Sequence, residues 1–67
     1  MQAYTVLIRP SGSREMWSNP REATAQGPRD AVNLIYGEST SISSMTGSHR
    51  FNLKYDGEWI DVVVVEN

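Results

Sequence analysis

The fold is decided by one continuous stretch, residues 48 to 65, which reads Ser48-His49-Arg50-Phe51-Asn52-Leu53-Lys54-Tyr55-Asp56-Gly57-Glu58-Trp59-Ile60-Asp61-Val62-Val63-Val64-Val65. Two runs of strand-forming residues flank Asp56-Gly57. An Asp-Gly pair favours a two-residue type I′ turn, because both central positions of that turn need φ > 0. The stretch therefore predicts a β-hairpin in which Tyr55 pairs with Glu58, and the pairing continues outward to His49 with Val64.

This register sorts the side chains of the hairpin onto two faces, because side chains alternate along a strand. One face is apolar, and we expect it to belong to the core: Phe51, Leu53, Ile60, Val62 and Val64. The second face mixes charged with apolar side chains: Arg50, Asn52, Lys54, Trp59, Asp61, Val63 and Val65. The second face is where we expect a functional surface.

Upstream of the hairpin, the residue pattern predicts two more strands. Residues 3 to 9 alternate and are rich in β-branched and aromatic types, which predicts a strand, and Leu7 on its second side favours a central place in the sheet. Residues 10 to 13, Pro-Ser-Gly-Ser, predict a turn. Residues 14 to 26 predict an irregular edge strand that is kinked near Pro20, since proline cannot donate to a strand ladder.

A helix is predicted from Pro28 to about Tyr36. Proline is favoured at the first helical position, Asp30 places a negative charge at the positive end of the helix dipole, and Gly37 is a natural stop. Its apolar side chains are expected to form a stripe that covers a sheet: Ala31, Val32, Leu34, Ile35 and Tyr36. The serine-rich residues after Gly37 would suit a flexible linker, but we favour a short strand at about 40 to 46.

The expected fold class is α+β, with a single helix packed on a mostly antiparallel sheet of four to five strands in the order β-β-α-β-β-β. Residues 1–67 form a single domain. If the helical connection crosses the sheet in the usual right-handed sense, the first strand lies between the second and the third. The final hairpin then extends the sheet.

Length and composition limit the class of protein. A chain of 67 residues builds one small core and buries roughly 60% of its unfolded surface. It contains no cysteine, which excludes disulfides and cysteine-based zinc sites. No signal peptide or long apolar run is recognisable, so we expect a soluble, unprocessed, cytoplasmic protein without membrane contact. Eight acidic and six basic residues give a net charge of −2, which is too balanced to imply a polyanionic partner.

The residues that carry most enzyme chemistry are sparse. His49 is the only histidine. A triad could be assembled on paper from Ser48, His49 and Asp56 or Asp61, but no nucleophile elbow accompanies them. We therefore predict that the protein is not an enzyme and has no catalytic residues.

Metal, cofactor and phosphate sites are not indicated either. Glu58 and Asp61 fall on opposite faces of their strand, and the oxygen spacing of a calcium loop is absent. Gly12 and Gly27 are isolated, so no glycine-rich phosphate loop is present. The helix start at Pro28 could hold an anion, but proline lacks an N–H and we favour an ordinary capped helix. The prediction is no cofactor and no metal.

One pattern resembles a known group of proteins. Gly12-Ser13, Trp17, Ala25, Asp30-Ala31, Tyr36-Gly37 and Ile42 are spaced as in small uncharacterised proteins encoded by cyanobacteria and their viruses, where a strand, a Trp-bearing strand and a helix that closes on Tyr-Gly recur. The resemblance covers residues 4–43 and omits the hairpin. It implies no activity, but it implies a viral or accessory protein that binds a host component.

The second face of the hairpin predicts a protein-protein interaction module. Trp and Arg dominate binding hot spots, and a continuous apolar patch usually marks an interface. The candidate partner-binding residues are Arg50, Lys54, Trp59, Val63 and Val65. Alternatively, the loop with Met16 and Trp17, or the helix, covers this face, and Lys54 only makes a cation-π contact with Trp59.

The sequence also allows two other modes of association. The valine run of the last strand, if it forms an exposed edge, would recruit another strand and produce a homodimer or a β-augmented complex. The runner-up function is binding of single-stranded nucleic acid through arginine and aromatic side chains on the sheet: Arg9, Arg14, Arg21, Arg29, Arg50, Trp17, Tyr36 and Trp59. Nucleic acid is less favoured because the chain has no excess of basic residues and no recognised motif.

Overall fold

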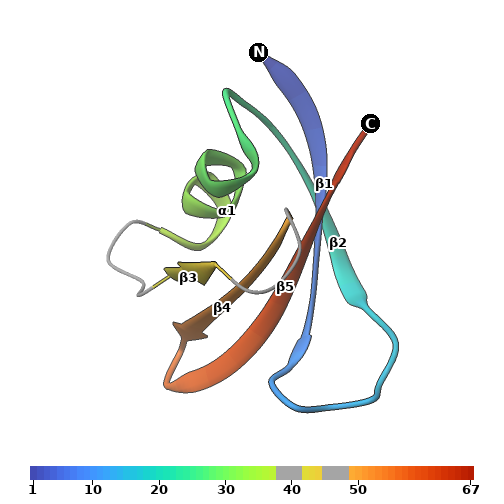
Figure 1. The fold of residues 1–67 in the computed structure, drawn as a ribbon, viewed down its shortest axis with the longest axis vertical. Helices are drawn as coiled ribbons and strands as arrows, with labels where there is room; N and C mark the ends of the chain where they lie inside the picture. Colours follow the sequence, from blue (N-terminus) through green and yellow to red (C-terminus); the bar gives the residue numbers. More distant parts are fainter. Residues whose placement is uncertain (38–41, 45–48) are drawn as a thin grey trace.

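The structure is a computed structural model that describes residues 1–37, 42–44 and 49–67 (Figure 1). Its elements follow one another as β1 (Gln2–Pro10), β2 (Ser18–Ala25), α1 (Pro28–Tyr36), β3 (Ile42–Ser44), β4 (Arg50–Tyr55) and β5 (Glu58–Glu66). The predicted α+β class and the order β-β-α-β-β-β are confirmed. The strand predicted at 40 to 46 is present as β3, and the rest of that range lies outside the described residues.

The sheet has the strand order β2-β1-β5-β4-β3, and all neighbours are antiparallel. The central place of β1 is confirmed, but its neighbours are β2 and β5, so the prediction that it lies beside β3 is wrong. The hairpin does not extend the sheet; it lies between β1 and β3. The reason is that β5 is as long as β1 and apolar on both sides at Val62, Val63 and Val64, whereas β3 has only three residues.

The segment between β1 and β2 is a loop for longer than predicted. The turn at 10 to 13 is confirmed: the Ser13 N–H donates to the Pro10 carbonyl at 3.0 Å, and Gly12 has φ 76°. Residues 14–17 are not part of the strand, because the Ser13 hydroxyl accepts from the Glu15 N–H at 2.9 Å and closes a local turn. β2 is an edge strand as predicted, and its register slips near Pro20, opposite Val6 to Ile8.

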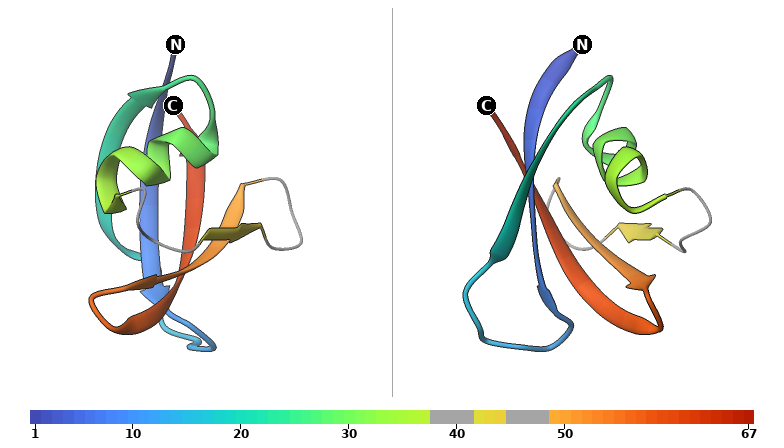
Figure 2. Two further views of the ribbon diagram at one scale, coloured as in Figure 1. Left: turned by 90° about the vertical axis from the view of Figure 1, so that its left-hand side faces the viewer. Right: turned by 180° about the vertical axis from the view of Figure 1, so that it is seen from behind.

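Helix α1 covers one face of the sheet (Figure 2). It runs from Pro28 to Tyr36, and the residue that caps it, Gly37, has φ 89° and donates its N–H to the Asn33 carbonyl at 2.8 Å. Ala31, Val32 and Tyr36 are buried, as predicted. Leu34 is 66% exposed, so its place in the buried stripe was predicted wrongly. At 3.6 residues per turn, Leu34 points about 150° from the mean direction of the buried Ala31, Val32 and Tyr36.

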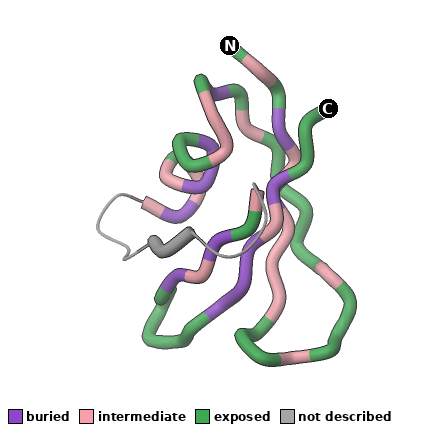
Figure 3. Tube along the Cα trace, in the orientation of Figure 1, coloured by how far each residue is buried: buried purple, intermediate pink, exposed green. Residues whose placement is uncertain are grey.

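The hairpin has the predicted register. Asp56 and Gly57 have φ 52° and 81°, as a type I′ turn requires, and the strand pairs run from Tyr55 with Glu58 to Arg50 with Val63. The face expected to be apolar core is buried at every position: Phe51, Leu53, Ile60, Val62 and Val64. These residues pack with Tyr4, Val6, Ala25 and the helix into one core cluster (Figure 3). The sheet therefore presents its other face away from the helix.

Candidate functional site

We call the sheet face opposite the helix the outer face. Strand pairing sets its side chains in rows that cross β4, β5 and β1 in that order: Arg50, Val63 and Leu7 form one row, Asn52, Asp61 and Arg9 form the next, and Lys54 stands beside Trp59. All five candidate partner-binding residues belong to this face: Arg50, Lys54, Trp59, Val63 and Val65. The hairpin register, which the sequence predicts, is what brings them together.

The apolar side chains of the outer face do not form one continuous patch. Trp59 is 48% exposed and Val65 is 47% exposed, but they stand six residues apart on β5, about 20 Å at the usual rise of a strand. Asp61 lies between Trp59 and Val63 on the same face, and Val63 is half-buried. The face therefore has an apolar position at each end and polar groups in the middle.

The middle of the outer face is a hydrogen-bonded cluster around Asp61, which is 9% exposed. The Asn52 Nδ2 donates to the Asp61 Oδ1 at 3.0 Å, and the Ser11 hydroxyl donates to the same oxygen at 3.3 Å. Asn52 also donates to the Ile60 carbonyl, and the Ser11 N–H donates to the Trp59 carbonyl at 3.1 Å. These bonds fix the loop 11–17 to the hairpin.

Trp17, at the end of that loop, lies against two arginine side chains of the outer face. The Cζ atom of Arg9 is 4.1 Å from the centroid of the indole ring, and the Cζ atom of Arg50 is 5.5 Å from it. The Arg9 Nη1 also donates to the Glu15 carbonyl at 3.4 Å. Trp17 thus covers the part of the face beside Arg50, which was one of the predicted alternatives, but it leaves Trp59 and Val65 exposed.

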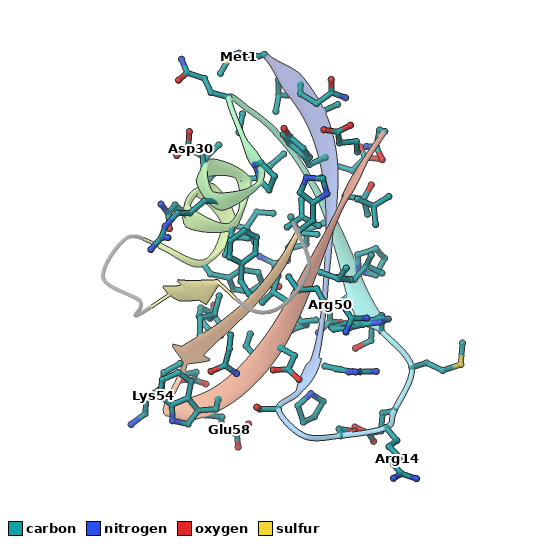
Figure 4. All side chains as sticks on the ribbon, in the orientation of Figure 1. Met1, Arg14, Asp30, Arg50, Lys54 and Glu58 are labelled. Atoms are coloured by element: carbon teal, nitrogen blue, oxygen red, sulfur yellow. The ribbon has the colours of Figure 1, made fainter. Side chains whose placement is uncertain are left out.

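The outer face carries more positive than negative side chains. Arg9, Arg50 and Lys54 stand on the outer face, and within residues 1–37 and 49–67 none of the three forms an ion pair. Glu58 and Glu66 are paired with Tyr55 and Tyr4, on the side of the helix. Figure 4 shows Arg50 over the middle of the sheet, Lys54 at the end of the hairpin and Arg14 at the loop. With Asp61 buried in the middle of this face and Glu22 at its β2 edge, the outer face keeps a small excess of positive charge although the chain is acidic.

The arginine and aromatic residues of the runner-up function are divided between surfaces. Tyr36 is 7% exposed in the core and makes an edge-to-face contact with Tyr55, with ring centroids 4.9 Å apart. Burial raises the pKa of Tyr36 above 10.0, while the positive charge of Arg21 acts in the opposite direction. Arg21 pairs with Val6, on the helix side of the sheet, and Arg29 is on the helix. Four of the eight share the outer face: Arg9, Arg50, Trp17 and Trp59.

The valine run of β5 is not an exposed edge, because β5 lies between β1 and β4. The condition on which recruitment of another strand through β5 was predicted is therefore not met. The long edge strand is β2, where Pro20 and the charged Arg21 and Glu22 are features that oppose addition of a strand.

Of the remaining candidates from the sequence, Ser48 lies outside the described residues, and His49 and Asp56 lie apart from each other. His49 is half-buried beside β5, where its carbonyl accepts the Val64 N–H at 2.9 Å, while Asp56 is in the turn at the far end of β4. In the described part of the chain, no three His, Asp or Glu side chains converge as a metal site would need. No helix in that part is long and apolar enough to cross a membrane.

A shallow concavity of about 270 Å³ lies away from the outer face, between α1, the end of β2 and the N-terminal residue Met1. Its lining combines apolar and polar side chains: Met1, Ala25, Gln26, Asp30, Asn33 and Leu34. Asp30 is its one ionisable side chain, so it offers no pair of groups for acid-base chemistry.

Sequence reasoning identified the outer face but missed what organises it. The roles of Ser11 and Arg9 depend on the folding of the loop 11–17 onto the hairpin. No local sequence pattern predicts this folding. The hairpin register predicts that Asn52 pairs with Asp61. The position of Asp61, an acid within a run of β-branched residues, is the feature of the sequence that could have indicated a polar cluster there. Comparison with protein-family models, with curated proteins and with solved structures found no match to this chain.

Proposed function

We propose that this protein is a non-enzymatic protein-binding module that contacts its partner through the outer face, with Trp59 as the anchor. The observation that carries the proposal is the 48% exposure of the Trp59 side chain on a hairpin whose turn and register are fixed. Tryptophan supplies a large contact area and is enriched in binding hot spots. Because the hairpin is ordered before binding, little conformational entropy is lost on association.

The neighbours of Trp59 support this assignment. Lys54 stands directly across from it on β4. The backbone carbonyl of Trp59 accepts a hydrogen bond from the Ser11 N–H, so the backbone of Trp59 is held by the same hydrogen bonds that fix the loop 11–17. Val65 offers a second apolar contact at the other end of β5. The resemblance to cyanobacterial and viral proteins makes a component of a host cell, met in the cytoplasm, the first partner to test.

Nucleic-acid binding receives less support. Two arginines and Trp17 share the outer face, as a stacking surface would need. However, the Arg9 guanidinium already lies over the ring of Trp17, with its Cζ atom 4.1 Å from the ring centroid, and Tyr36 is buried in the core. A base would have to displace Arg9 to stack on Trp17, so we favour a protein partner.

Affinity capture from host-cell lysate tests the proposal with two variants of the full chain. Trp59→Ala removes the anchor, and Leu34→Ala removes an exposed apolar side chain from the helix, on the other side of the sheet. We expect Trp59→Ala to lose the captured partner and Leu34→Ala to retain it. Equal capture of every partner by Trp59→Ala would refute the proposal. Sedimentation of the purified chain is done first, since a homodimer formed through the outer face would make the partner a second copy.

A further inference from the structure

We infer that the partner segment is acidic and that a carboxylate of that segment binds between Arg50 and Arg9 while an apolar side chain contacts Trp59. This inference rests on the proposed protein-binding function and adds the chemistry of the partner. It follows from the hydrogen-bonding state of the two arginines, from the charge of the outer face and from the spacing of its rows.

Arg50 is exposed and has its donors available. Its guanidinium contacts the Trp17 ring at 5.5 Å, and in the described residues it makes no hydrogen bond or ion pair. Contact with an aromatic ring uses none of the five N–H donors of an arginine. A guanidinium with free N–H groups in a fixed fork matches a carboxylate in bidentate geometry.

Arg9 adds a second positive charge, which forms no ion pair within the described residues. Its strand neighbour Asp61 is engaged by Asn52 and Ser11, and the Arg9 Nη1 donates to a backbone carbonyl. The Arg9 Nε is buried and has no hydrogen-bond partner in the described residues. Two like charges gathered at one indole ring repel each other, so an anion placed between them would relieve that repulsion.

The rest of the outer face favours the same partner. Lys54 extends the basic character toward Trp59, whereas Glu58 and Glu66 lie on the helix side of the hairpin. Glu22, which pairs with Thr5, stands on the outer face at its β2 edge, and Glu15 belongs to the loop. An acidic segment would therefore lie along the hairpin rather than along β2, because complementary charge sets orientation as well as partner choice.

The spacing of the rows defines the segment further. The row of Arg50 and the row of Lys54 with Trp59 are four residues apart, about 13 Å along the strands. In an extended segment, residues four apart point to the same side, because the side-chain period is two. We expect an Asp or Glu and a large apolar side chain at that separation.

Selection of displayed random dodecapeptides on the full chain tests this inference. The same selection is run on Arg50→Gln and on Arg14→Gln, which removes an equal charge from an exposed loop position. We expect peptides with an acid four residues from an apolar side chain. Their synthetic forms should bind Arg50→Gln about tenfold more weakly, a typical hot-spot loss, and bind Arg14→Gln unchanged. Replacing the peptide acid with its amide should cause the same loss, and no further loss on Arg50→Gln.

The outcomes separate the inference from the proposed function. Neutral or basic peptides that depend on Trp59 and ignore Arg50→Gln would overturn the acidic site and leave protein binding standing. Failure to select any peptide, together with binding of an oligothymidylate that requires Arg50, would overturn both in favour of nucleic acid. If neither peptides nor the oligonucleotide bind, both are overturned. Far-UV circular dichroism of each variant confirms that folding is unchanged.

Discussion

The contact between Arg9 and Trp17 should contribute measurably to stability. The Arg9 Cζ lies 4.1 Å from the ring centroid, well inside the range of a cation-π interaction, and both side chains are half-buried. Such contacts are worth about 0.5–1 kcal/mol when exposed and about 2 kcal/mol when desolvated, so we expect about 1 kcal/mol here. For Arg50, which is exposed and 5.5 Å from the ring, we expect about 0.5 kcal/mol.

A double-mutant cycle isolates this energy. Arg9→Met keeps the aliphatic stem and removes the charge, Trp17→Leu removes the ring, and urea unfolding followed by circular dichroism gives the free energy of unfolding of each variant. A parallel cycle with Arg14→Met, whose side chain is exposed, should give no coupling. If the Arg9-Trp17 coupling lay within about 0.3 kcal/mol of zero, the usual limit of additivity, the ring would not hold the arginine and our account of the outer face would be wrong.

Three further predictions concern the turn, the core and the polar cluster. Gly57→Ala should lower the free energy of unfolding by about 1–2 kcal/mol because φ is 81°, and Gly57→Asn should lower it less, as urea titrations would reveal; equal losses would contradict the φ argument. Burial raises the pKa of Tyr36, so the stability that its protonated form provides is complete below about pH 10 and is lost as pH rises through the folded-state pKa. Urea titrations above about pH 10 should therefore show a steeper loss for the wild type than for Tyr36→Phe, and parallel losses would refute the shift. Asn52→Ala should cost about 1–3 kcal/mol because it leaves the buried Asp61 with one donor fewer, and in a thermodynamic cycle with Asp61→Ala the two losses should not add.

The sequence predicts most of what is local in this fold. Asp56-Gly57 defines the turn, the alternation around it defines the register, and Pro28 and Gly37 bound the helix. Each of these depends on residues within one element or one turn. The strand order could not be predicted from local sequence, because it depends on which long strand with apolar side chains on both faces pairs with β1.

The candidate site likewise has a part that local sequence predicts and a part that depends on contacts between distant segments. The five partner-binding residues follow from the register, so the sequence is sufficient to place them on one face. Their surroundings depend on Ser11 and Trp17, which reach the hairpin through a loop held by side-chain hydrogen bonds and ring contacts. Such contacts leave no periodic pattern in the sequence. The sequence therefore names Trp17 as a residue that would cover the outer face, but it does not predict which part of the face Trp17 covers.

Asp61 also protects the pairing of the strand that carries it. β5 is otherwise apolar from Trp59 to Val65, and such a strand could slide along either neighbour with little change in hydrophobic contact. A slip of one residue into the place of Val62 would turn Asp61 toward Ile8 and Phe51 on the core face, away from the Asn52 amide and the Ser11 hydroxyl. Burying an unpaired carboxylate costs several kcal/mol, a large share of the stability of so small a domain. A single acid within the valine run thus destabilises misaligned pairings of β5. The same effect destabilises misaligned sheets that separate chains would form during folding.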